Sequence, residues 1–372
     1  MTTFDMTAYL NNHHLICYII IVISSVCITL LSIPSIIYVA RIRNLYDDSS
    51  FLRKKHNADI SCLGGVGIFA GFTITVLLFG LTTKAIPVNY LLASCILLFI
   101  MGIKDDLLGV NPGTKLVIQL IAALILVIPG NIRISSLYGF LGVYDIPYFA
   151  GVALTVLTII FIINAFNLID GIDGLAATIG IIVNGVFSGL FIYIGQYELA
   201  TIPLAVTGAI IGFIKFNITP AKIFMGDTGA FLIGLISVVM AITFIETNKI
   251  SGNDAPGILS APVIVIAILI IPIVDASRVF VLRIAKGDSP FKADRNHIHH
   301  RLLKLGFTHI QTTIVLAISN ILTILVAFLF TGYSTILLIV IISVVPLTLN
   351  WVLSYLIRSK ERKSYKLRNL FI

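Results

Sequence analysis

Two asparagines and two aspartates recur at three-residue intervals in the stretch NAFNLIDGIDGLA, at Asn164, Asn167, Asp170 and Asp173. A strongly apolar segment, GVALTVLTIIFII, directly precedes them. Carboxylate and amide oxygens are the donors that hard cations prefer, and Mg²⁺ commonly binds through one or two carboxylates together with substrate phosphates. The stretch therefore indicates a site for Mg²⁺ or Mn²⁺ and a phosphorylated substrate at the end of an apolar helix.

The spacing of these four residues also predicts where the helix ends. Each step of three residues turns 300° around an α-helix, so four such residues cannot share one face of a straight helix. Non-helical backbone at membrane depth is tolerated only where it lines a polar cavity. We therefore expect the helix to break at Asp170, so that the two Asp-Gly repeats fold back into the site.

Three other stretches carry similar chemistry, and each has a simpler explanation when it stands alone. The charged KDD of MGIKDDLLGVNPGTK (101–115) and the histidines of DRNHIHHRLLKLGF (294–307) could be interfacial decoration. In KFNITPAKIFMGDTGAFLIG (215–234), Asp227 or Thr228 could cap a helix beginning near Gly229. Asp-Gly repeats could likewise be a cap and a turn. Four such stretches on one face of a protein favour a shared site.

The elements that must position these residues are membrane helices. The chain has 372 residues, of which 58% are hydrophobic and only 11% are charged, against about 25% in soluble domains. A helix needs about 20 apolar residues to cross the bilayer core. We expect one all-α polytopic bundle (domain 1–372), with a short external β-hairpin over 131–148. Eleven spans are predicted, near 15–40, 63–82, 88–103, 115–129, 149–167, 177–195, 199–216, 228–246, 260–282, 311–331 and 333–357.

Charge predicts the orientation of these spans. With the N-terminus outside, all but three of the 25 basic residues fall in inner loops or in the C-terminal tail, the exceptions being Lys84, Arg133 and Lys249. The positive-inside rule then places the C-terminus in the cytoplasm, together with all four polar stretches. The basic tail, 358–372, is expected to face anionic lipid. Nucleic-acid binding is excluded as a function, because no soluble basic domain exists to provide it.

In combination, DD after the third span, NAFNLIDGIDGLA, FNITPAKIFMGDTGAFLIG and DRNHIHHRLLKLG resemble the polyprenyl-phosphate N-acetylhexosamine-1-phosphate transferases. The form HIHHR is similar to the branch that transfers GlcNAc-1-phosphate to undecaprenyl phosphate. The resemblance runs from about Arg41 to Gly306. It implies a magnesium-dependent enzyme of the bacterial cytoplasmic (inner) membrane, with its site on the cytoplasmic face. Such an enzyme makes lipid-diphospho-sugar and UMP from a UDP-N-acetylhexosamine, the initiating step of a cell-envelope glycan.

The resemblance also implies a role for each site residue. Asp227 resembles the Mg²⁺ ligand, and Asp105 and Asp106 resemble a catalytic pair at the lipid phosphate. Asp173 and His299 are likewise implied in catalysis, Asp173 near the metal and the diphosphate. The implied substrate-binding residues form two groups: Asn167, Asp170, Asn217 and Phe224 in the nucleotide pocket, with Phe224 stacked on uracil, and His297, His300 and Arg301 in the loop that recognises sugar and diphosphate.

The residues leave several alternatives open. A lipid phosphate is mostly dianionic at neutral pH, which favours direct attack, but a covalent aspartyl intermediate is also compatible with the sequence. Which N-acetylhexosamine is used, which polymer it feeds and whether the protein forms a homodimer are not decided by the pattern. A cation-coupled transporter or lipid flippase, with Asp170 and Asp173 as ion ligands, is the competing class, and it predicts mid-membrane carboxylates and an internal repeat.

Overall fold

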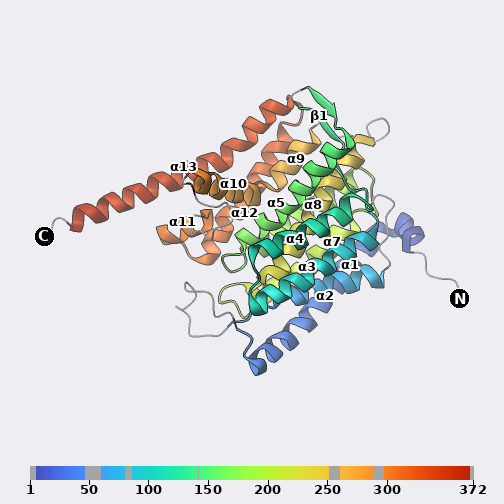
Figure 1. Ribbon diagram of the computed structural model, residues 1–372, viewed down its shortest axis with the longest axis horizontal. Helices are drawn as coiled ribbons and strands as arrows, with labels where there is room; N and C mark the ends of the chain where they lie inside the picture. The colour runs from blue at the N-terminus through green and yellow to red at the C-terminus, as the bar shows by residue number, and fades with distance from the viewer. Residues whose placement is uncertain are drawn as a thin grey trace.

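The computed structural model describes residues 6–46, 60–79, 86–140, 142–250, 260–285, 287 and 297–368. Its elements lie side by side in one helical bundle, and the long last helix extends beyond the bundle toward the C-terminus (Figure 1). In order, they are α1 (Met6–Arg43), α2 (Gly64–Leu78), α3 (Val88–Leu108), α4 (Pro112–Val127), β1 (Ser136–Phe140), β2 (Val143–Asp145), α5 (Tyr148–Ile169), α6 (Leu175–Tyr193), α7 (Thr201–Asn217), α8 (Gly226–Ile250), α9 (Ala261–Ile268), α10 (Ile270–Ala285), α11 (Ile298–Leu305), α12 (His309–Leu329) and α13 (Thr335–Arg368).

The number of full-length membrane spans is smaller than the sequence predicts. Among the described residues, six helices are long and apolar enough to cross a membrane, or seven if the bent pair α9–α10 counts as one span. The prediction of eleven is therefore wrong on this criterion, although each predicted segment does coincide with a helix or, for the ninth, with that pair. The helices α2, α4 and α7 have only 15 to 17 residues. At 1.5 Å per residue they reach about 22–26 Å, less than the roughly 30 Å hydrocarbon core.

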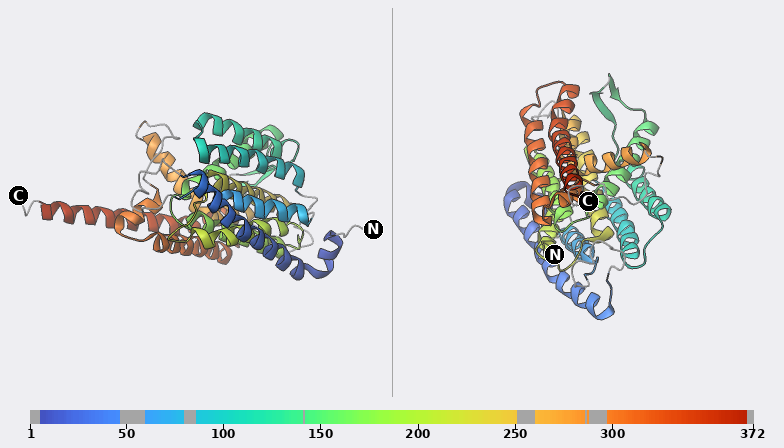
Figure 2. Two further views of the ribbon diagram at one scale, coloured as in Figure 1. Left: turned by 90° about the horizontal axis from the view of Figure 1, so that it is seen from below. Right: turned by 90° about the vertical axis from the view of Figure 1, so that its left-hand side faces the viewer.

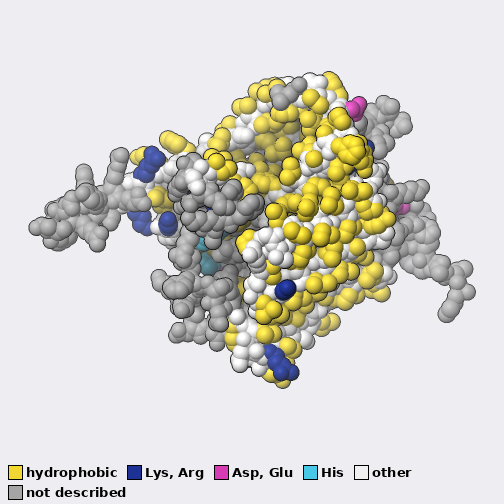
Figure 3. Space-filling model, viewed as in Figure 1, with side chains coloured by type: hydrophobic (Ala, Val, Ile, Leu, Met, Phe, Trp, Pro, Cys, Tyr) yellow, Lys and Arg dark blue, Asp and Glu magenta, His cyan; other side chains and the backbone are white. Residues whose placement is uncertain are grey.

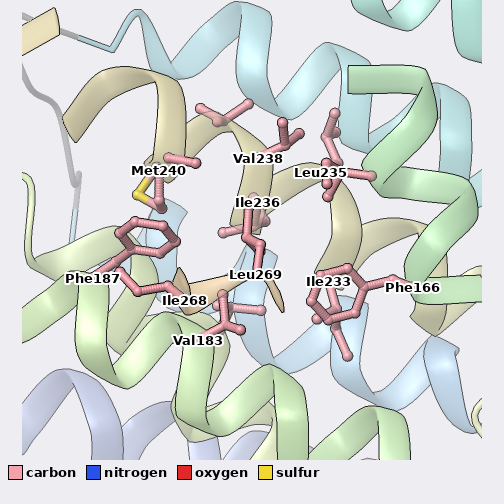
Figure 4. Packing of buried hydrophobic residues seen from close by; sticks show 14 of the residues in the cluster. Phe166, Val183, Phe187, Ile233, Leu235, Ile236, Val238, Met240, Ile268 and Leu269 are labelled. Atoms are coloured by element: carbon pink, nitrogen blue, oxygen red, sulfur yellow. The ribbon is translucent and has the colours of Figure 1, made fainter. Parts of the chain in front are cut away.

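Helix α8 is the centre of the bundle. Its residues 228–245 are all buried, and it contacts α2, α3, α5, α6, α7 and α9. Figure 4 shows its side chains, among them Ile233, Ile236 and Met240, packed with Phe166 of α5 and Phe187 of α6. A helix that is apolar on every side is expected in such a central position. The first turn of α8 carries Asp227, so the central helix also fixes one of the predicted site residues.

The outer surface of the bundle is apolar as well. Leu31, Leu157 and Trp351 are 77%, 66% and 69% exposed, and hydrophobic side chains cover most of the face drawn in Figure 3. The basic side chains on that face lie toward the end of α13 and the lower edge. An apolar surface of this extent is unfavourable in water and suits a lipid environment. Together with the apolar spans, it makes this a multi-pass membrane protein, as the sequence predicts.

The predicted ninth span is broken. Helices α9 and α10 meet at an angle of 76°. The change of direction between them can be followed in Figure 2. A break in a membrane helix leaves backbone carbonyls without intrahelical partners. Asn320 of α12 donates its Nδ2 to the Ile268 carbonyl, the last of α9, at 3.3 Å. The neighbouring helix thus stabilises the bend.

The predicted hairpin over 131–148 is confirmed. Strands β1 and β2 pair antiparallel, with Ser136 opposite Asp145. Glu246, near the end of α8, accepts hydrogen bonds from the backbone N–H of Ser135 at 2.8 Å and from its hydroxyl at 2.6 Å. These bonds fasten the base of the hairpin to the central helix, at the end of α8 away from Asp227.

Candidate active site

Two carboxylates from different helices converge on one ammonium group. Lys115 Nζ donates to Asp105 Oδ2 at 2.5 Å and to Asp227 Oδ2 at 2.9 Å. Asp105 lies in the last turn of α3, Lys115 in the first turn of α4 and Asp227 in the first turn of α8. Burial works against ionisation of Asp105, but hydrogen bonding with Asp227 and Lys115 outweighs it and holds the pKa of Asp105 below its usual value. The result is a partly shielded cluster that can hold a cation between two carboxylates.

The turn between α3 and α4 brings Lys115 back toward Asp105. Asn111 caps α4 by accepting from the backbone N–H of Gly113, with Pro112 in the first helical turn. The second oxygen of Asp105 accepts from the backbone N–H of Val110 at 2.6 Å. The sequence NPG is therefore a tight helix start, and it places Lys115 next to an aspartate that lies ten residues earlier.

Asp106 has a different environment from its neighbour Asp105. Its carboxylate accepts from the backbone N–H groups of Asp227 and Thr228, at 2.8 and 3.2 Å, and from the Thr228 hydroxyl at 2.6 Å. These donors lie at the N-terminus of α8, so Asp106 caps that helix from α3. Burial raises the pKa of Asp106 to about 6. The two aspartates predicted as one catalytic pair thus make different contacts, Asp105 with Lys115 and Asp106 with the α8 backbone.

The cap by Asp106 requires a glycine at position 226. Gly226 has φ +71°, and a side chain there would come within 2.7 Å of both carboxylate oxygens of Asp106. Helix α8 begins at Gly226. A cap by Asp227 or Thr228 would have meant a helix that begins three residues later, near Gly229. That alternative is wrong because the capping carboxylate comes from another helix, which leaves the Asp227 side chain available to Lys115 and Asn167.

Helix α5 ends as its spacing predicts. The helix stops at Ile169 with Asp170 as its C-terminal cap residue, and α6 starts at Leu175. Just before this end, Asn167 donates its Nδ2 to Asp227 Oδ1 at 2.6 Å. Because Asn167 occupies one oxygen of Asp227 and Lys115 the other, the orientation of the Asp227 carboxylate is fixed from two sides.

The Asp-Gly loop that follows is held by side chains of three other segments. Asn217 at the end of α7 accepts from the backbone N–H of Gly174 at 2.9 Å and donates to the Ile223 carbonyl at 3.0 Å. The carboxylate of Asp173 accepts from the Thr219 hydroxyl at 3.0 Å and lies 3.4 Å from Nδ1 of His309. Hence Asn217 and Asp173 are both placed at this loop, where their side chains hold its backbone and the start of α12.

The histidine loop contacts the Asp-Gly loop between α5 and α6 from the other side. His297 Nδ1 lies 2.9 Å from Asp275 Oδ2, and the backbone N–H of Ile298 donates to Asp275 Oδ1 at 2.7 Å. His299 is 1% exposed, and its ring lies against the backbone at Gly171. Its Nε2 has no hydrogen-bond partner among the residues that the structure describes. A buried ring nitrogen without a partner, beside the Asp-Gly loop, is a candidate for contact with a bound ligand.

The remaining predicted residues divide between this site and its surroundings. The His300 ring lies 4.2 Å from that of His299, centroid to centroid. Half-buried Phe224 is anchored by its backbone N–H on the Ser61 carbonyl, at 2.9 Å, three residues before Asp227. The guanidinium of Arg301 is instead directed to α13, where it donates to Asn350 and Ser354. Residues 294–296 of the predicted loop lie outside the described residues.

The residues present fit a hard divalent cation. No group of three or more His, Cys, Asp and Glu side chains within the described part of the chain could form a closed metal cage. Two carboxylates that already share one cationic partner, with an amide beside them, are the open donor set that Mg²⁺ uses with substrate phosphates and water. Asp227 and Asp105 are the residues that would hold it.

Sequence reasoning assigned no part in the site to three residues of this arrangement: Lys115, which it treated only as an inner-loop charge, Asp275 and His309. A signal existed for two of them. Lys115 follows a helix-start signal directly after KDD, and Asp275 is a lone carboxylate inside an apolar span, which is costly without a partner. His309 had no comparable signal, because it reaches Asp173 only through the packing of α12.

Comparison with known proteins identifies the family. The model for glycosyl transferase family 4 matches residues 88–245. Over 292 residues the chain is 31% identical to the undecaprenyl-phosphate alpha-N-acetylglucosaminyl 1-phosphate transferase of Escherichia coli O157:H7, covering 76% of this chain and 75% of that protein. The chain belongs to the polyprenyl-phosphate N-acetylhexosamine-1-phosphate transferase family. Another member, the decaprenyl-phosphate N-acetylglucosaminephosphotransferase of Mycolicibacterium smegmatis, is 34% identical over 234 residues, 59% of this chain and 57% of that protein.

The family match also separates two parts of the site. The matched region, 88–245, contains Asp105, Lys115, Asn167 and Asp227, whereas the histidine loop lies beyond it. The candidate site thus consists of a carboxylate–ammonium cluster inside the matched region and a histidine helix, α11, from the C-terminal part of the chain. Both parts meet at the Asp-Gly loop after α5.

Proposed function

We propose that the protein transfers GlcNAc-1-phosphate from UDP-GlcNAc to undecaprenyl phosphate, giving undecaprenyl-diphospho-GlcNAc and UMP. The observation that carries the proposal is the convergence of Asp105 and Asp227 on Lys115, beside an Asp-Gly loop and a buried histidine. Such a cluster suits a diphosphate, which brings negative charge and a divalent cation to the same place. The names of the relatives from Escherichia coli and Mycolicibacterium smegmatis support a polyprenyl phosphate acceptor and a GlcNAc-phosphate group.

The reaction exchanges one phosphoanhydride for another. A non-bridging oxygen of the lipid phosphate attacks the β-phosphorus of the UDP-sugar, and the bond from that phosphorus to the oxygen bridging the two phosphates breaks. The bridging oxygen leaves with UMP, so no water or external energy source is consumed. Since a phosphomonoester loses its second proton near pH 6, the attacking group needs little base catalysis at neutral pH. Positioning and charge neutralisation therefore account for most of the catalysis.

The described contacts support a division of labour at the diphosphate. Mg²⁺, when bound, would neutralise charge on the diphosphate and the departing UMP. Asp227 and Asp105 would hold it, with Asn167 fixing the angle of Asp227. Lys115, which now contacts both carboxylates, would then be free to contact a phosphate oxygen, where an ammonium stabilises the charge that develops during transfer.

Other residues would bind the rest of the donor. Phe224, whose backbone is held three residues before Asp227, is proposed to stack on uracil. Asp170 lies at the end of α5, where the Asp-Gly loop begins. His299, with an unpartnered Nε2 at the Asp-Gly loop, is proposed to donate to the sugar or diphosphate, with His300 next to it. Asp173 and Asn217 would act by holding the loop, because their side chains are engaged with neighbouring segments.

The proposed location is the cytoplasmic face of the bacterial inner membrane. The site residues lie at the ends of α3, α5 and α7 and at the starts of α4 and α8, which is the face to which charge asymmetry assigns the cytoplasm. A transporter would need ion ligands near the middle of the bilayer. Asp105, Asp170 and Asp227 lie instead at helix ends. No observation therefore favours the transporter alternative.

The test is magnesium-dependent transfer in two site variants. Asp227→Asn should abolish transfer from UDP-GlcNAc to undecaprenyl phosphate at every Mg²⁺ concentration, and Lys115→Gln should lower turnover at least tenfold. Lys104→Gln, an exposed lysine one residue before the KDD aspartates, is the matched control and should keep full activity. Near-normal turnover of Asp227→Asn at saturating Mg²⁺ would remove Asp227 from the metal site.

A further inference from the structure

The most basic residue of the histidine helix points away from the site. Helix α11 spans eight residues and carries His299, His300 and Arg301 in succession. The Arg301 side chain is 6% exposed, and its guanidinium donates to Asn350 Oδ1 and, at 2.7 Å, to Ser354 Oγ. Burial lowers the pKa of Arg301, but a guanidinium stays charged in any case. These two hydrogen bonds orient the buried guanidinium toward α13.

Both partners of Arg301 lie on one face of the last helix. Asn350 and Ser354 are four residues apart on α13, and the Ser354 hydroxyl in turn donates to the Asn350 carbonyl at 2.8 Å. Residues at this spacing are neighbours on a helix surface. Each terminal nitrogen of the guanidinium contacts one of the two oxygens, in a rigid planar fork that an ammonium does not reproduce. The geometry is therefore specific for arginine and for this pair of positions.

A second contact joins the same two helices. Lys360 Nζ donates to the backbone carbonyl of Lys304, in the last turn of α11, at 2.9 Å. The last carbonyls of a helix lack intrahelical partners, and a lysine there also suits the helix dipole. Leu302 of α11 and Leu353 of α13 are both buried. Helix α13 thus contacts the middle of α11 through the hydrogen bonds of Arg301 and the C-terminal end of α11 through Lys360.

The N-terminal half of α11 is fixed to the site. Asp275 binds His297 and the backbone N–H of Ile298, and His299 lies against Gly171. The whole helix is only about 12 Å long. Because so short a helix moves as a unit, a shift of its C-terminal half relative to α13 would move His299 and His300 relative to the Asp-Gly loop.

We infer that Arg301, Asn350 and Ser354 form a latch through which the C-terminal helix α13 positions the histidines of α11 over the donor. In this account Arg301 is a positioning residue that does not touch substrate. The inference rests on the proposed function for the identity of the donor. It gives α13, which lies outside the family-matched region, a defined part in the reaction.

The test compares variants on the two sides of the latch. Arg301→Gln and the double variant Asn350→Ala/Ser354→Ala should each lower kcat/KM for UDP-GlcNAc about tenfold to a hundredfold, the effect of a small misplacement of reacting groups. The KM for undecaprenyl phosphate should stay within about twofold. Combining all three substitutions should cost no more than Arg301→Gln alone, because both changes break the same contact. Thr348→Ala is the control, since this exposed α13 hydroxyl bonds only its own helix among the contacts described.

Three results would overturn the latch. Full activity in Asn350→Ala/Ser354→Ala, with loss only in Arg301→Gln, would show that Arg301 acts directly on substrate. Lower melting temperatures with unchanged kinetics would leave the contact with a purely structural role. Additive effects of the two sets of substitutions, in kinetics or in melting temperature, would show that they are not coupled.

Failure of the proposed function looks different from failure of the latch. If the wild-type protein transfers nothing from UDP-GlcNAc, the proposed function and the kinetic part of the inference both fall. The latch is still measured by the melting temperatures without substrate. In the absence of substrate, the triple variant should have the same melting temperature as Arg301→Gln if the contact exists. It should have a lower melting temperature if the contact does not exist.

Discussion

The imidazole of His299 occupies the space that a side chain at Gly171 would need. A Cβ built on Gly171 would come within 3.0 Å of His299 Cε1 and closer still to Nε2. Glycine at this position therefore lets the histidine helix approach the Asp-Gly loop. The motifs DGIDG and HIHH, well over a hundred residues apart in the sequence, meet at this contact.

This contact predicts that Gly171→Ala displaces His299 and lowers transfer. A methyl group inserted here must push the ring aside, because the three atoms nearest to it all belong to the His299 imidazole. A misplacement of about 1 Å can cost on the order of a hundredfold in rate. We expect at least a tenfold loss of kcat, measured as UMP release by purified protein. Gly185→Ala on α6 is the matched control, since a Cβ there meets nothing within 4 Å. Equal activity of the two variants would show that His299 is not needed at this position.

Much of the bundle is predictable from the sequence because its signals are local. Apolar runs locate each helix, and the three-residue spacing up to Asp170 correctly predicts where α5 ends. The 76° bend between α9 and α10 is not evident from hydropathy, because residues 261–274 form one unbroken apolar run and the stabilising Asn320 comes from another helix. The sequence predicts full spans for the short helices α2, α4 and α7, because hydropathy alone does not measure helix length.

The site follows the same division between local and non-local signals. Motif residues such as Asn167 and Asp227 are indicated by type and spacing, and the structure brings them into contact. The partner of each side chain is not indicated: Asp106 binds the α8 backbone and Arg301 binds α13. Those contacts join segments that are far apart in the sequence, so only the packing of the helices reveals them.

The capping role of Asp106 predicts a loss of stability that Asp105 does not share. Asp106→Ala leaves two backbone N–H groups at the start of α8 without their acceptor, a loss of about 1–2 kcal/mol for an N-cap. We expect a lower melting temperature in detergent together with lost activity. Asp105→Ala should lose activity with a smaller change in melting temperature, because Lys115 keeps Asp227 as a partner. A melting temperature for Asp106→Ala equal to that of the wild type would contradict the cap.

Stacking by Phe224 predicts a change that is selective for the donor. Aromatic–base stacking is worth about 1–3 kcal/mol by alanine substitution, or roughly 5- to 150-fold in affinity. Phe224→Ala should raise the KM for the UDP-sugar and weaken inhibition by UMP in parallel, while the KM for the lipid phosphate stays nearly constant. Unchanged affinity for UMP in a well-folded variant would remove Phe224 from the nucleotide pocket.

Burial of His299 predicts loss of stability in acid. Burial, with the nearby charge of His300, lowers the pKa of His299 from 6.5 to about 3 despite the opposing effect of Asp275. The folded protein therefore binds this proton less readily than the unfolded chain. The stabilisation is fully present above pH 6.5 and is lost as pH falls toward 3. At pH 5.5 the loss is on the order of 1 kcal/mol. Melting temperatures at pH 8 and 5.5 should differ less in His299→Gln than in the wild type, and equal differences would contradict the assignment.

The identity of the nucleotide product tests the central claim most directly. Purified protein is given UDP-GlcNAc labelled in the sugar, undecaprenyl phosphate and Mg²⁺, and the released nucleotide and the labelled lipid are both quantified. Transfer of sugar-1-phosphate predicts one UMP for each labelled lipid, with neither product formed after chelation of the metal or by Asp227→Asn. Release of UDP in place of UMP would mean that the bond from sugar to phosphate is broken, and would contradict the account.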